Sequence, residues 1–164
     1  MTVGLPIALP LLATLLLAAL EDARTRRIPN ALVVASLMLA WSTRLFLDGG
    51  SGALSFVTGL LLPAWFRGWT GAGDGKLMAV VGAWLGAPQG AMAVLFSLIA
   101  GGAIAFAVAM RHGMVRQSLA GAAAMGAWAA APHAGAPPQP LTNLRYPFAF
   151  AVLVGTFAAL WVRS

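Results

Sequence analysis

The chain has 164 residues, of which 60% are hydrophobic and 9% are charged. Soluble domains average close to half apolar residues, so we interpret the chain as an integral membrane protein with one membrane-embedded domain over residues 1–164. It contains no cysteine, which excludes disulfides, cysteine-ligated zinc and iron–sulfur centres. The net charge of +6 does not indicate a nucleic-acid partner, because the few basic residues lie between apolar segments, where they set membrane orientation.

Six apolar stretches predict an all-α fold, a polytopic membrane bundle of about six transmembrane helices. In chain order they cover residues 3–20, 31–47, 53–66, 76–85, 91–110 and 147–162. A bilayer core takes about 20 helical residues to cross, and the first, second, fifth and sixth stretches come near that length.

Residues 117–131 are ambiguous, because they are rich in Ala and Gly and short for a crossing. We predict an interfacial or loosely packed helix, followed by a Pro-rich polar loop. A seventh span is the alternative.

Lys and Arg in short loops predict the orientation. With six spans, all but two of them share one face, which we expect to be cytoplasmic: Arg24, Arg26, Arg27, Arg67, Lys76, Arg111, Arg116 and Arg145. Arg44 and Arg163 fall on the opposite face. A seventh span leaves this bias unchanged, because it moves Arg145 to the outer face and Arg163 to the cytoplasmic face.

The stretch GAGDGKLMAVVGAWLG, residues 71–86, places Asp74 and Lys76 against an apolar helix. If a turn at Gly86–Gly90 marks the outer boundary, Asp74 lies roughly 18 Å from it along the helix, within a hydrocarbon core about 30 Å thick. An acid at that depth requires protein or a water-filled cavity around it.

We therefore predict a hydrated notch that opens to the cytoplasm. Gly71, Gly73 and Gly75 are expected to allow positive φ and close backbone approach there. In the alternative interpretation, Asp74 is only the N-cap of the helix, and Lys76 is its ion-pair partner or a snorkelling anchor.

The other acids are Glu21, Asp22 and Asp48. We expect Asp48, which precedes the turn GGSGA, to be a solvated loop residue. Asp22 lies at the same predicted face as Asp74, before a basic loop that ends at Asn30, which could cap the next helix or bond across the loop. Asp22 could be a solvated residue of that loop, or it could meet Asp74 across a shared cavity.

Two neighbouring carboxyl groups form an acid–base pair, because their like charges keep one protonated while the other is ionised. The ionised group takes a proton from water, and the protonated one donates to a scissile carbonyl. His112 and His133 have no evident acid partner and are interpreted as surface residues. No metal-ligand spacing is recognisable, so we expect neither a metal nor another cofactor.

These residues carry a resemblance to a known family. GAGD at 71–74 fits the GxGD motif of intramembrane aspartic proteases, and residues 71–86 resemble the second-aspartate region of type IV prepilin peptidases. DARTRRIPN at 22–30 resembles their first-aspartate region, and LRYPFAFAVLVG at 144–155 is similar to their last helix.

The resemblance implies a bacterial inner-membrane aspartic endopeptidase that removes the basic leader of type IV pilins and pseudopilins at the cytoplasmic face. Asp22 and Asp74 would be its catalytic pair, supported by an active-site loop of Gly71, Gly73, Gly75 and Lys76. Its partners would be the prepilin helix and the lipid bilayer.

Many members carry a further cysteine-rich domain and also N-methylate the product. This cysteine-free sequence looks like the minimal form, similar to the peptidases of tight-adherence (Flp-type) pili, and we expect no methyltransferase activity. The alternative functions are a small transporter or channel subunit that uses intramembrane carboxylates, although we see no internal repeat, and a scaffold subunit of a secretion apparatus.

Overall fold

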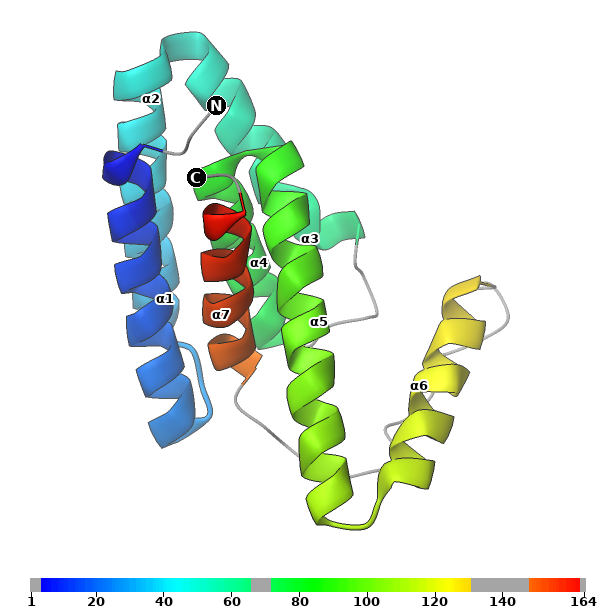
Figure 1. Cartoon of the computed structure of the whole chain (residues 1–164). Coiled ribbons are helices and arrows are strands. Elements are labelled where there is room, and N and C mark those ends of the chain that lie inside the picture. The colour runs from blue at the N-terminus through cyan, green and yellow to red at the C-terminus, as the bar shows by residue number, and fades with distance from the viewer. Residues whose placement is uncertain (1–3, 66–71, 131–147, 163–164) are drawn as a thin grey trace. The chain divides into compact units, whose positions relative to one another are not determined.

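The computed structural model describes residues 4–65, 72–130 and 148–162, and every regular element in these ranges is a helix. This confirms the predicted all-α fold. The elements are α1 (Leu5–Thr25), α2 (Asn30–Leu60), α3 (Leu62–Trp65), α4 (Ala72–Leu85), α5 (Ala87–Arg111), α6 (Val115–Ala130) and α7 (Phe148–Trp161) (Figure 1).

Within the described residues, α1, α2 and α5 are long and apolar enough to cross a membrane, and α7 is a shorter apolar helix. The chain is thus a multi-pass membrane protein. The ambiguous stretch forms α6, which has 16 residues and is not among these candidate spans. The Pro-rich loop predicted after it lies outside the described residues.

The second and third predicted spans belong to one element, α2, which bends sharply at Gly49 (Figure 1). Gly49 has φ 57° and ψ −133°, a conformation that side chains disfavour and that glycine adopts readily. The predicted third span, residues 53–66, extends past the end of α2 at Leu60 into the short helix α3.

The chain folds into two compact units, Met1–Gly101 with Pro147–Ser164, and Gly102–Tyr146. The first holds α1 to α4, the first part of α5, and α7; the second holds the rest of α5 and α6. The single domain over residues 1–164 stays a prediction. Both Asp22 and Asp74 lie in the first unit.

A buried chain of hydrogen bonds crosses the core of this unit. The indole Nε1–H of Trp84, a fully buried side chain, donates to Oγ of Ser36 over 2.9 Å. The Ser36 hydroxyl donates to Oγ1 of Thr14 over 3.2 Å, and Thr14 donates to the carbonyl of Pro10 over 2.8 Å. These bonds tie α4 to α2 and α1 and satisfy polar groups that burial would otherwise leave unpaired.

Glycines allow the closest helix packing. A Cβ on Gly59 of α2 would overlap the backbone of Gly82 of α4, and the reverse holds as well. A Cβ on Gly155 of α7 would overlap the backbone of Ser97 of α5. Small residues at such crossings let helix backbones approach, as is common between membrane helices.

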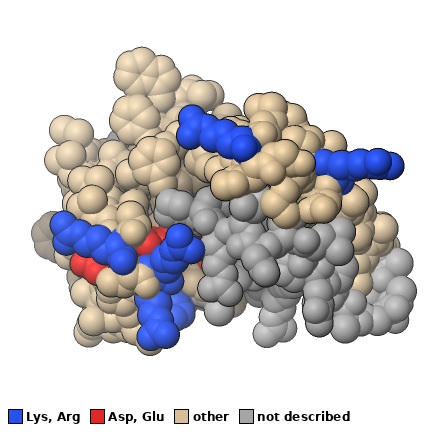
Figure 2. Space-filling view, turned by 90° about the horizontal axis from the view of Figure 1, so that it is seen from below, with Lys and Arg blue, Asp and Glu red and all other residues tan. Residues whose placement is uncertain are grey.

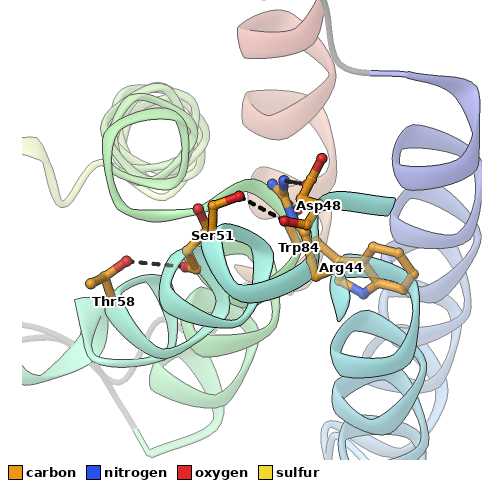
Figure 3. A network of polar contacts seen from close by, with 6 residues as sticks. Arg44, Asp48, Ser51, Thr58 and Trp84 are labelled. Atoms are coloured by element: carbon orange, nitrogen blue, oxygen red, sulfur yellow. Dashed lines mark hydrogen bonds and ion pairs between the residues drawn. The ribbon is translucent and has the colours of Figure 1, made fainter. Parts of the chain in front are cut away.

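Asp48 is exposed, as predicted, but it lies within α2 and not in a loop, and it forms an ion pair with Arg44 (Figure 3). The Arg44 guanidinium donates from Nε and Nη2 to the carbonyl of Trp84, over 2.9 and 2.6 Å, and from Nη1 to Oδ2 of Asp48 over 3.0 Å. It thereby satisfies one of the last carbonyls of α4, which have no partner within the helix.

Candidate active site

Asp22 lies in the last turn of α1, so this helix continues past the apolar stretch that ended the predicted first span at residue 20. Arg26 ends the helix in the left-handed conformation, with φ 53° and ψ 31°, and its backbone N–H donates to the carbonyl of Asp22 over 2.9 Å. A left-handed residue after the last turn is a common way to stop a helix, although it costs a non-glycine residue about 1 kcal/mol. The half-buried Asp22 is therefore a helix residue next to a sharp turn.

Asp74 lies in the first turn of α4, which begins at Ala72 and not at the predicted residue 76. Asp74 is half-buried. The N-terminal end of a helix carries partial positive charge, which favours a carboxylate in its first turn.

The backbone conformation predicted for Gly73 and Gly75 is wrong, whereas their supporting role at the site stays a prediction. Both residues, like Lys76, lie in helix α4 and not in a loop, and neither has positive φ. A Cβ on Gly73 would lie 3.6 Å from Cδ1 of Ile28, and one on Gly75 would lie 4.0 Å from Cβ of Pro63, which are ordinary contacts. Gly71 lies outside the described residues.

One cavity of about 580 Å³ brings the two aspartates together. Its lining consists of Asp22, Arg26, Arg27, Ile28, Pro29, Asn30, Gly73, Asp74 and Lys76. On the left of Figure 2, basic side chains lie around acidic ones at the end of the molecule where α1 ends. Two acids from different helices and three cations therefore share a polar cavity.

Lys76 and Asn30 join two sides of this cavity. The Lys76 Nζ donates to Oδ1 of Asn30 over 2.6 Å. Asn30 was predicted to cap α2 or to bond across its own loop, and its bond instead reaches α4, so both predictions are wrong. The residue before α2 is Pro29, and no side chain caps the helix.

Sequence reasoning missed the contribution of α7. The backbone N–H of Ala149 donates to Oδ2 of Asp22 over 3.3 Å, across 127 positions of sequence. The motif at 144–155 had suggested a family helix, but no local pattern indicates which side chain that helix contacts.

His112 is not among the residues that line this cavity. His112 is exposed and belongs to the second unit, and His133 lies outside the described residues. Among the residues that the structure describes, no three His, Asp or Glu side chains cluster closely enough to hold a metal ion.

Comparison with protein families matches residues 9–106 to the type IV leader peptidase family. The chain belongs to this family. Members are aspartic peptidases that remove the leader of prepilins. Membership makes this protein a prepilin leader peptidase. The match includes every residue of the cavity lining and ends before α6 and α7. Comparison with curated proteins and with solved structures gave no match.

Proposed function

We propose that Asp22 and Asp74 are the catalytic pair of this peptidase. The single observation that carries the proposal is that both side chains line one polar cavity, although they come from different helices. Family membership supports an aspartic mechanism, and these two are the acids of the described cavity lining.

In the proposed reaction, the pair holds one proton between its two carboxyl groups. The ionised carboxylate takes a proton from water as the water oxygen bonds to the scissile carbonyl carbon. The protonated carboxyl donates to the carbonyl oxygen, which gives a gem-diol. Transfer of a proton to the leaving nitrogen then allows the C–N bond to break. Because the groups titrate together, neither role is assigned to one residue.

We also propose that the cavity faces the cytoplasm. Arg24 lies in the last turn of α1. Arg26 and Arg27 follow it and line the cavity together with Lys76. Arg44 lies near the other end of α4. An excess of basic residues in short loops favours the cytoplasmic side.

The proposed substrate is a prepilin helix with a basic leader, of the tight-adherence (Flp) class. The support for this class is the resemblance of residues 22–30 and 71–86, in a sequence without cysteine. Peptide bonds inside a helix are shielded, so cleavage requires local unwinding of the substrate. A polar cavity at the helix ends suits cleavage of a peptide bond at the point where the substrate helix emerges from the membrane.

The test is cleavage of a co-expressed Flp-type prepilin by three single variants, Asp22→Asn, Asp74→Asn and Asp48→Asn. Asn keeps a hydrogen-bond acceptor but cannot exchange the proton, so the first two should each lose at least about 100-fold in rate. The double variant should be little worse than either single one, because the pair acts as a unit. Asp48→Asn is the matched control outside the cavity and should cleave normally. Near wild-type cleavage by Asp22→Asn or by Asp74→Asn refutes the pair.

A further inference from the structure

The hydrogen bond between Asp22 and α7 links the proposed catalytic pair to a helix beyond the family match. Ala149 is the second residue of α7, is 1% exposed, and donates its backbone N–H to Oδ2 of Asp22 over 3.3 Å. The family match stops at residue 106. A part of the chain outside the match therefore touches the carboxylate directly.

The electrostatics of the two helix ends explain why this hydrogen bond is favourable. Asp22 lies in the last turn of α1, where the partial negative charge of the helix end opposes a carboxylate. The first turn of α7 has the opposite partial charge, and its amides have no partners within the helix. The Asp22 carboxylate thus accepts from an N–H that has no partner within α7, and this bond offsets the unfavourable position of the carboxylate at the end of α1.

Packing holds α7 in place for this role. α1 and α7 run side by side in opposite directions (Figure 1) and pack against each other. Both contribute fully buried side chains to the core, Leu11 and Leu15 from α1 and Val152 from α7. The close crossing of Gly155 with Ser97 fixes α7 against α5 as well.

We propose that the first turn of α7 is a positioning element for Asp22. The Ala149 amide holds Oδ2, so that Oδ1 is the oxygen presented to water and substrate. The inference rests on the proposed catalytic pair, because positioning matters for cleavage only if Asp22 takes part in it.

The first experiment removes the donor with Ala149→Pro in the full chain. Proline lacks the N–H and is accepted early in a helix, as Pro6 is at the second position of α1. Ala149→Val adds comparable bulk but keeps the amide. We expect kcat for prepilin cleavage to be about tenfold lower in the Pro variant than in the Val variant, with similar KM. Equal kcat values for two folded variants overturn the proposal.

A second measurement does not depend on folding of the Pro variant or on activity. Hydrogen–deuterium exchange of residues 148–152 is compared in wild type, Asp22→Ala and Asp74→Ala. Loss of the Asp22 carboxylate should speed exchange at Ala149 severalfold, and loss of Asp74 should not. Unchanged exchange in Asp22→Ala overturns the positioning role. If instead the proposal of the catalytic pair is wrong, Asp22→Asn cleaves prepilin at close to the wild-type rate, which separates the two failures.

Discussion

Lys76 and Asn30 are joined by a 2.6 Å hydrogen bond from Nζ to Oδ1, which ties the start of α4 to the first residue of α2. Lys76 follows Asp74 by two positions, and Asn30 begins the helix after the short loop that follows α1 and Asp22. The bond therefore couples the backbone segments that carry the two aspartates, in a protein whose proposed chemistry depends on their separation.

Removal of this bond should lower cleavage without abolishing it. Lys76→Met removes the donor and Asn30→Leu removes the acceptor, and we expect each to reduce kcat about three- to tenfold. The double variant should match the single ones, because all three lack the same bond. The test is kcat of the purified variants on a prepilin. If the loss of kcat in the double variant equals the product of the two single losses, the two side chains act separately.

The close helix crossing at Gly59 and Gly82 should make alanine there destabilising. A methyl group at either position overlaps the backbone of the other helix, so Gly59→Ala and Gly82→Ala should each cost at least about 1–3 kcal/mol of unfolding free energy. Unfolding in mixed micelles measures this effect.

Gly73→Ala and Gly75→Ala are the matched controls, because a Cβ at these positions meets its neighbours only at ordinary van der Waals distance. They should be at least as stable as wild type, because alanine inside a helix is favoured over glycine by roughly 0.5–1 kcal/mol. If they also lose cleavage, these glycines serve the approach of the substrate and not the fold. A destabilisation equal to that of Gly82→Ala would contradict the packing described for α4.

The buried hydroxyl of Ser36 should contribute to stability through Trp84. Ser36→Ala leaves the buried indole N–H without its acceptor, and we expect a loss of about 1–3 kcal/mol. Trp84→Phe combined with Ser36→Ala leaves no such donor, so the two losses should be less than additive. Thermal unfolding of the single and double variants tests the coupling, and strict additivity would argue against it.

The Arg44 network should stabilise the fold without entering the chemistry. Trp84 lies ten residues along α4 from Asp74, roughly 15 Å at the helical rise. Arg44→Gln should cost about 1.5–3 kcal/mol, because the Trp84 carbonyl loses a charged donor. Asp48→Asn should cost only about 0.3–0.5 kcal/mol, since this i,i+4 pair is partly exposed. Cleavage rates per folded molecule should stay at the wild-type value for both, and a selective fall in kcat would contradict the separation of network and cavity.

Local composition and motif spacing were sufficient for the class of protein, the helical fold and the family. Apolar stretches reveal membrane helices because every residue of a lipid-facing helix contributes to the signal. The pattern around Asp22 and Asp74 indicated an aspartic peptidase, and the two residues do line one cavity. The turn GGSGA was predicted between the second and third spans, and α2 bends there, at Gly49.

Helix ends and partners depended on the folded chain. α1 runs through the polar Glu21 and Asp22 because its end is set by the left-handed turn at Arg26, and hydropathy does not report such a turn. Gly73 and Gly75 suggested an irregular loop, yet α4 incorporates both. The bonds of Lys76 to Asn30 and of Ala149 to Asp22 join residues far apart in sequence. The first bond follows from the packing of α2 with α4 and the second from the packing of α1 with α7. A sequence pattern does not specify which helices become neighbours.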